Sequence, residues 1–199
     1  GDGCETIVTT VVNCGSCGVV CNLPNAVAAC VSGACAVQSC FAGFSNCDSN
    51  NANGCEVQHG LAANSCAFPT DLGSLCADTQ CGGFCQSASV VTGPVINDRR
   101  TRWFRMSASE CDSSCPGSMQ HIVRLGVPAG VNYDVFIYSA CGGTLLGSGT
   151  NAAGTAETIN LTRPKTPGVN DSFLYWIEVR WISGQSCATY TLSIDGKDC

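Results

Sequence analysis

Cysteine is the residue type whose number and spacing allow the most chemistry in this chain. A cysteine thiol can form a disulfide, ligate a metal or act as a nucleophile, and 18 of the 199 residues carry one. In a reducing compartment most of these thiols would stay free, so their number indicates an oxidising, extracellular location. Because the total is even, every cysteine can be paired. We expect disulfides at Cys4, Cys14, Cys17, Cys21, Cys30, Cys35, Cys40, Cys47, Cys55, Cys66, Cys76, Cys81, Cys85, Cys111, Cys115, Cys141, Cys187 and Cys199.

The cysteines are spaced in two different ways. They recur every few residues from Cys4 to Cys55 and become sparse after Cys85. The dense part predicts a small scaffold held by cross-links, because so short a segment with few large apolar residues buries little surface. The sparse part predicts a domain with its own core. We place the boundary at Cys66, which gives a cysteine-rich module of residues 1–66 and a second domain of residues 67–199.

A repeated motif suggests one pairing rule. Gly-Cys-Glu occurs at residues 3–5 and again at residues 54–56, which indicates a repeat and predicts further copies upstream. If the cysteine of each motif bonds the next cysteine, the disulfides are Cys4–Cys14 and Cys55–Cys66. The cysteines that remain on each side of the boundary are then even in number, so the second domain holds four bridges of its own. Sequence alone does not fix connectivity.

Two alternatives to a purely disulfide-bonded module concern metals. The spacing Cys14-x2-Cys17-x3-Cys21 is typical of zinc or iron–sulfur ligands, but disulfides are the preferred interpretation outside the cell. Residues 48–56 place hard oxygens at intervals around a glycine, as calcium loops do. Two carboxylates predict only weak binding, and an Asn/Gly turn between repeats is the alternative. Calcium is the one cofactor that we consider, and its candidate ligands are Asp48, Asn50, Asn53 and Glu56.

The sequence offers few residues for catalysis. The two histidines, His59 and His121, lie in a linker and at the start of a predicted strand, without a nucleophile motif. Glu110 and Asp112 form a close pair of carboxylates beside Cys111, and we interpret them as an exposed loop held by disulfides. We therefore expect that the protein is not an enzyme.

Charge excludes some partners and suggests another. Charged residues make up 12% of the chain and the net charge is −6, so no basic surface for nucleic acid is expected. No apolar run approaches the roughly 20 residues that span a bilayer. We expect a secreted chain whose signal peptide has been removed. The only basic cluster is a candidate for self-association with an acidic patch, or else a solvated strand edge: Arg99, Arg100, Arg102 and Arg105.

The elements that position these residues are predicted to be short strands. Residues 173–181 alternate, with Tyr175, Ile177 and Val179 on one face and Trp176, Glu178 and Arg180 on the other. Further candidate strands are residues 90–96, 101–107, 120–127, 133–138, 144–146, 157–161 and 188–194. Gly, Asn, Pro and Ser separate them. The fold class is mainly β: a small disulfide-rich module and an antiparallel β-sandwich or jelly roll.

Two parts of the chain resemble known families. The string GCE, NCGxCGxxC, PNAxxxC, GxCxxxxC, CDxNxxNGCE over residues 3–56 resembles the cysteine-rich repeats of bacterial secreted and surface proteins, which implies an extracellular stalk or spacer. The strings WFR at 103, LGVPAG at 125, YDVFIY at 133, YWIEV at 175 and YTLSI at 190 resemble the bacterial pre-peptidase C-terminal (PPC) domain. That resemblance implies a β-sandwich appended to secreted enzymes and associated with surface attachment, matrix binding and in some members calcium.

These observations favour a non-enzymatic extracellular protein. The first hypothesis is a structural or adhesive protein, a subunit of a surface filament that assembles with itself head to tail. The alternative is an accessory module that attaches a larger secreted protein to carbohydrate or matrix. Trp103, Trp176 and Trp181 are candidates for stacking on sugars, although packing in the core is the expected role of all three.

Overall fold

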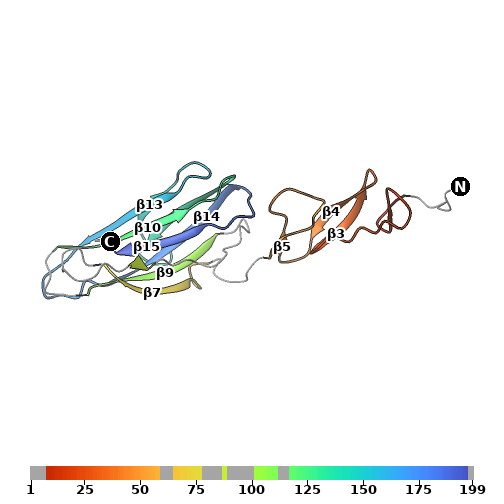
Figure 1. Cartoon of the computed structure of the whole chain (residues 1–199). Helices are drawn as coiled ribbons and strands as arrows, with labels where there is room; N and C mark the ends of the chain where they lie inside the picture. Colours follow the sequence, from red (N-terminus) through yellow and green to blue (C-terminus); the bar gives the residue numbers. More distant parts are fainter. Residues whose placement is uncertain (1–7, 59–64, 78–86, 89–100, 112–116, 197–199) are drawn as a thin grey trace. The chain divides into compact units, whose positions relative to one another are not determined.

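The computed structural model of the chain describes residues 8–58, 65–77, 87–88, 101–111 and 117–196. They form two compact units: residues 8–58 with Gln185–Cys187 belong to the first, and the other described residues belong to the second. The regular structure of the described residues is all β, without a helix, which confirms the predicted fold class (Figure 1). No helix in this part of the chain is therefore long and apolar enough to cross a membrane.

The first unit consists of three small antiparallel sheets of two strands each. The strands are β1 (Thr9–Thr10) with β2 (Asn13–Cys14), β3 (Ala26–Val31) with β4 (Ala34–Cys40), and β5 (Phe44–Ser45) with β6 (Val57–Gln58). The β3–β4 hairpin turns through Ser32 and Gly33, both at positive φ (51° and 80°), as a two-residue turn that matches strand twist requires. These elements are too short to enclose an apolar core.

Disulfides fill the interior of the first unit instead. Four half-cystines are among its most deeply buried residues: Cys14, Cys21, Cys47 and Cys55. Most of its valines are exposed instead: Val8, Val11, Val12, Val19, Val20, Val27 and Val31. Three disulfides close loops of similar size, with sequence separations of 16, 14 and 15 residues: Cys14–Cys30, Cys21–Cys35 and Cys40–Cys55. Each such loop of about 15 residues stabilises the fold by about 3 kcal/mol through restriction of the unfolded chain.

The predicted pairing rule is wrong. Cys14 bonds Cys30 rather than Cys4, and Cys55 bonds Cys40 rather than Cys66. The β3–β4 hairpin is the reason, because it places Cys30 and Cys35 opposite each other, and each then reaches a cysteine that precedes the hairpin, Cys14 of β2 and Cys21 respectively. The disulfides of residues 1–66 and of residues 67–199 are also not two separate sets, since Cys47 bonds Cys187. The described residues include no free cysteine.

The second unit contains two larger sheets. The five-stranded sheet has the order β12 (Leu145–Gly149), β11 (Val131–Tyr138), β14 (Phe173–Gly184), β9 (Arg102–Ser109) and β7 (Thr70–Cys76). The four-stranded sheet has the order β13 (Glu157–Pro164), β10 (Ser118–Gly126), β15 (Thr191–Gly196) and β8 (Ser87–Ala88). All neighbours are antiparallel except β7 and β9, which are parallel. Strand β7 was not predicted, and the predicted strand at 90–96 lies outside the described residues.

The two sheets share one apolar core and so form a β-sandwich. Alternate residues of β9, β10, β11 and β14 are buried, as the period-two pattern predicted. On β14 these are Tyr175, Ile177 and Val179, none of them exposed. Two further disulfides, Cys66–Cys141 and Cys76–Cys111, join loops and strand ends of this unit. The intervening residues of the five-stranded sheet point away from the core and form its outer face.

Candidate functional site

Aromatic side chains gather on the outer face of the five-stranded sheet. Trp103 on β9, Trp176 on β14, and Phe136 and Tyr138 on β11 occupy the positions between buried residues, and all four are partly exposed. Strand register brings them together, since Glu178 of β14 lies opposite both Trp103 and Phe136, and Trp176 lies opposite Tyr138. The rings of Trp103 and Tyr138 are in contact, with centroids 5.6 Å apart and planes tilted by 33°.

A carboxylate lies at the centre of these rings. The side chain of Glu178 is only 7% exposed, and Arg180 donates to it twice, from Nε to Oε1 at 3.0 Å and from Nη2 to Oε2 at 2.7 Å. Tyr138 donates its hydroxyl to Oε2 at 3.1 Å. Burial first, and then the adjacent Glu178 charge, raise the pKa of Tyr138, so its hydroxyl remains a donor at neutral pH. The bidentate guanidinium satisfies the carboxylate that the rings shield from water.

The guanidinium of Arg180 also belongs to the ring surface. Its Cζ lies 4.2 Å from the centre of the Phe136 ring, so the cation stacks on Phe136 while it binds Glu178. Asp134, the next outward residue of β11, has a raised pKa because of burial, which the Arg180 charge partly offsets. We call Trp103, Phe136, Tyr138, Trp176, Glu178 and Arg180 the aromatic face. It offers flat apolar rings beside fixed hydrogen-bonding groups, which is how a polar ligand with apolar patches is held.

Two members of the predicted basic cluster, Arg102 and Arg105, are among the described residues, and they do not form an exposed patch. Arg102 points to the core side of β9 and is 8% exposed. Arg105 points outward but pairs with Asp71 of the parallel strand β7, and this pairing is the main reason that the pKa of Asp71 is lowered. Arg99 and Arg100 lie outside the described residues. Self-association through this cluster therefore stays a prediction.

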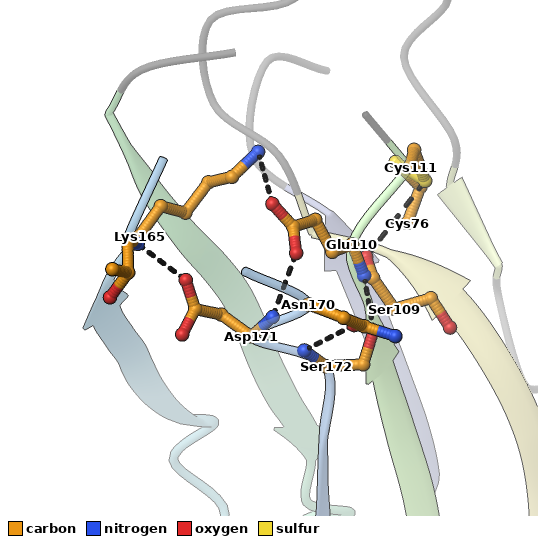
Figure 2. Close-up of polar contacts among 9 residues, drawn as sticks. Cys76, Ser109, Glu110, Cys111, Lys165, Asn170, Asp171 and Ser172 are labelled. Atoms are coloured by element: carbon orange, nitrogen blue, oxygen red, sulfur yellow. Dashed lines mark hydrogen bonds and ion pairs between the residues drawn. A yellow bond between two sulfur atoms is a disulfide. The ribbon is translucent and has the colours of Figure 1, made fainter. Parts of the chain in front are cut away.

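A second polar cluster lies where β9, β13 and the loop before β14 meet (Figure 2). Lys165 Nζ lies 3.1 Å from Glu110 Oε1, and these side chains are only 1% and 2% exposed. The backbone N–H of Asp171 donates to Glu110 Oε2 at 2.7 Å, and the N–H of Glu110 donates to Ser172 Oγ at 2.8 Å (Figure 2). Glu110 was expected in an exposed loop, which is wrong because it is the buried partner of a lysine. Its neighbour Asp112 lies outside the described residues.

A polar hollow of about 400 Å³ adjoins this second cluster, lined by Arg163, Pro164, Thr166, Asn170, Asp171 and Ser172. Its groups are largely engaged in local bonds. Asp171 Oδ2 accepts from the Thr166 N–H, Asn170 Oδ1 accepts from the Ser172 N–H, and Arg163 stacks on Phe173 at 4.5 Å. The cluster therefore holds a loop in place, and the aromatic face is the stronger candidate for binding.

The candidate calcium loop is held by its own hydrogen bonds. Asp48 accepts from the Asn50 N–H and from Asn53 Nδ2, both at 2.8 Å, and these bonds lower its pKa. Asn50 Oδ1 accepts from the Ala52 N–H at 3.1 Å. Glu56 is used elsewhere, since its Oε2 accepts from the Cys47 N–H at 3.2 Å. This geometry explains an Asn/Gly turn without an ion, and calcium binding stays a prediction.

The other candidate residues have structural surroundings. Cys14, Cys17 and Cys21, the alternative metal ligands, are all disulfide-bonded and offer no thiolate. His121 is fully buried: its Nε2–H donates to Leu75 O at 3.2 Å, and its Nδ1 accepts from the Tyr175 hydroxyl at 2.7 Å. Burial lowers the pKa of His121 to about 4, so it is neutral at physiological pH. His59 lies outside the described residues.

Of the three tryptophans expected in the core, only Trp181 packs there, with its Nε1–H donating to Gly184 O at 3.1 Å. Trp103 and Trp176 lie on the outer face instead. The alternating pattern of β14 had placed Trp176, Glu178 and Arg180 on one side of the strand, and this pattern was the signal in the sequence that pointed to the aromatic face. The contributions of Phe136 and Tyr138 to the aromatic face were not predicted, because the sequence does not show which strand pairs with β14.

Comparison with known proteins adds a structural likeness to a solved domain. No family model matches the chain, and no curated protein matches it. Among solved structures, the chain is similar to the 1.0 Å crystal structure of the pre-peptidase C-terminal domain of collagenase from Bacillus anthracis. The sequences are 11% identical, the match covers 63% of this chain and 95% of that domain, and the TM-score is 0.35. A solved PPC domain is thus among the structural neighbours, at a distance too great to assign function, and the resemblance to cysteine-rich repeats stays a prediction.

Proposed function

We propose that this chain is a non-enzymatic extracellular module that attaches a larger secreted protein to a neutral polysaccharide through the aromatic face. The observation that carries the proposal is the group of half-exposed rings around the Glu178–Arg180 pair. The disulfides are compatible with the extracellular location. The neutral, fully hydrogen-bonded His121 supports a role without catalysis.

The chemistry of the aromatic face fits a sugar polymer. One face of a pyranose ring exposes C–H groups that pack on an aromatic ring, while its hydroxyls need donors and acceptors at the edge. Trp103 and Trp176 supply ring surface, and the partly exposed Arg180 and Tyr138 supply polar groups that Glu178 fixes in place. Because these groups are already held in position, little side-chain entropy is lost on binding.

Charge favours a neutral polymer over an anionic one. On the outer face, Arg180 is bound to Glu178 and Arg105 to Asp71, and Asp134 adds a further acid. The chain as a whole carries a net charge of −6. An anionic glycan would therefore be repelled over long range, whereas a neutral one would not.

Cosedimentation of the full chain with insoluble cellulose, chitin and xylan tests the proposal. We expect at least one of these polymers to retain the chain, and expect Trp103→Ala and Trp176→Ala each to weaken retention at least tenfold. Phe41→Ala is the matched control, because Phe41 is an aromatic residue that is 51% exposed and belongs to the first unit, whereas the aromatic face belongs to the second. Thermal melting of each variant checks that the sandwich still folds.

Two outcomes contradict the proposal. The first is no retention on any neutral polymer, and the second is equal retention of the tryptophan variants and the wild type. If the first outcome holds, electron microscopy asks in addition whether the chain forms ordered assemblies that Trp103→Ala abolishes. That last result would favour the filament hypothesis.

A further inference from the structure

The disulfide Cys47–Cys187 encloses a much larger part of the chain than any other described disulfide. Its two cysteines are 140 residues apart in sequence, against 75 residues for Cys66–Cys141, the next largest separation. Cys47 is 2% exposed and its N–H is bonded to Glu56, which follows β5 and precedes β6. Both cysteines belong to the first unit, where Gln185–Cys187 joins the cysteine-rich residues.

The enclosed segment contains the entire five-stranded sheet. Strands β7, β9, β11, β12 and β14 all lie between Cys47 and Cys187 in sequence, and so do β10 and β13 of the other sheet. Of the strands in the two sheets, only β15 follows Cys187. The aromatic face, built on β9, β11 and β14, is thus wholly inside the covalent loop.

This connectivity decides how a pulling force passes along the chain. A force applied before Cys47 and after Cys187 follows the shortest covalent path, which is the disulfide itself. Without it, Cys66–Cys141 still closes 75 of the 140 residues, so the force would unfold the sheet to release the other 65 residues, roughly 220 Å of extended chain. Hydrogen bonds and apolar packing yield under a sustained load at a rate set by the unfolding barrier, whereas a disulfide is a covalent bond.

We infer that the chain carries tension, with Cys47–Cys187 conducting the load past the five-stranded sheet so that this sheet stays folded while the chain is pulled. The cysteine-rich unit is built in the same way, since Cys14–Cys30 also shortens the path that can be stretched. From Cys14 to Cys187 the extensible backbone is only the segment between Cys30 and Cys47. This inference goes beyond ligand binding and does not depend on it.

Single-molecule stretching of the oxidised full chain tests the inference. Handles are attached through clickable residues in place of Ala42 and Ala188, which are both exposed and lie just outside the two cysteines. In the wild-type chain we expect an extension of about 20 Å between the handles, from the few residues outside the disulfide. In Cys47→Ser/Cys187→Ser the sandwich should unfold and add more than about 100 Å, even though Cys40–Cys55 and Cys66–Cys141 still shorten the path.

A control variant and a second way of removing the disulfide complete the test. Cys76→Ser/Cys111→Ser removes a disulfide inside the enclosed segment and should extend no more than the wild type. If the first variant does not fold, as judged by circular dichroism, wild-type chain treated with dithiothreitol during the pull replaces it and should lengthen beyond 100 Å. The inference is overturned if the oxidised wild type lengthens by more than about 100 Å, or if loss of Cys47–Cys187 adds no length. It is equally overturned if peptide mapping without reductant finds Cys47 and Cys187 unlinked.

Discussion

The cysteine-rich unit and the β-sandwich differ in what fills their interiors. The first buries half-cystines, with Ala26 and Val57 the only other apolar residues in its interior among those described. The second buries a continuous set of apolar side chains from both sheets, including Tyr133, Tyr175 and Tyr190. Stability in the first unit therefore comes mainly from limits on the unfolded chain, and in the second from removal of apolar surface from water. The two should respond differently to reduction, truncation and pH.

The largest expected difference between the two units is their response to reduction of the disulfides. Loss of Cys14–Cys30, Cys21–Cys35 and Cys40–Cys55 removes about 2–4 kcal/mol each, which exceeds what so small an interior can supply. We expect residues 8–58 to unfold in dithiothreitol while the sandwich core remains folded. Hydrogen exchange read by mass spectrometry after alkylation measures both parts at once. Retained protection of β3 and β4 in reduced protein would show that the first unit has a sufficient core without disulfides.

The buried ion pair gives the next largest effect. Lys165→Ala leaves the Glu110 carboxylate buried without its cation, and removal of one partner of such a pair costs about 3–5 kcal/mol. Urea denaturation of the sandwich measures the loss. Replacement of both partners, Lys165→Met with Glu110→Gln, should recover most of the stability. A loss below about 1 kcal/mol for Lys165→Ala would mean that water reaches the pair.

A matched pair of truncations compares the two interiors directly. Ile177→Ala in the sandwich leaves a cavity and should cost about 2–5 kcal/mol, because Ile177 is not exposed at all. Val12→Ala in the first unit should change stability by less than about 0.5 kcal/mol, because Val12 is 53% exposed. Denaturant midpoints at constant m-value report both changes. Equal costs would remove the distinction between a cystine interior and an apolar one.

The smallest effect is a loss of stability in acid, confined to the sandwich. The folded-state pKa of His121, about 4, lies below the 6.5 of an unfolded chain, so the unfolded state binds the proton first. The contribution of neutral His121 is complete above pH 6.5 and is lost as pH falls towards 4, with about 2 kcal/mol gone at pH 5. Melting curves of wild type and His121→Gln between pH 7 and 4 measure it. An equal pH dependence in both proteins would contradict a buried neutral histidine.

Sequence predicted the sandwich better than the cysteine-rich unit for a physical reason. Alternation on β9, β11 and β14 records which side of each strand meets the core, so it is readable without knowledge of neighbouring strands. Strand β7 carries no such pattern, because Thr70, Asp71 and Ser74 lie at an exposed sheet edge. Disulfide pairing depends on which loops the β3–β4 hairpin brings together, and local spacing does not record that.

The same limit explains what was missed at the candidate site. Trp176, Glu178 and Arg180 share a strand, so their common face was evident from the sequence. The contributions of Phe136 and Tyr138 depend on β11 lying next to β14, which is a property of the folded sheet. The pairing of Lys165 with Glu110 likewise joins residues distant in sequence.

The three tryptophans allow the most direct test of the binding face, because two lie on it and one packs against the core. The measurement is the ¹H–¹⁵N spectrum of the indole N–H groups during titration with oligosaccharides of the polymer that retains the chain. We predict that the Trp103 and Trp176 signals shift with one binding curve while the Trp181 signal, bonded to Gly184 O, stays in place. A shift of the Trp181 signal alone, or no shift of any tryptophan signal at saturating ligand, would contradict a binding site on the aromatic face.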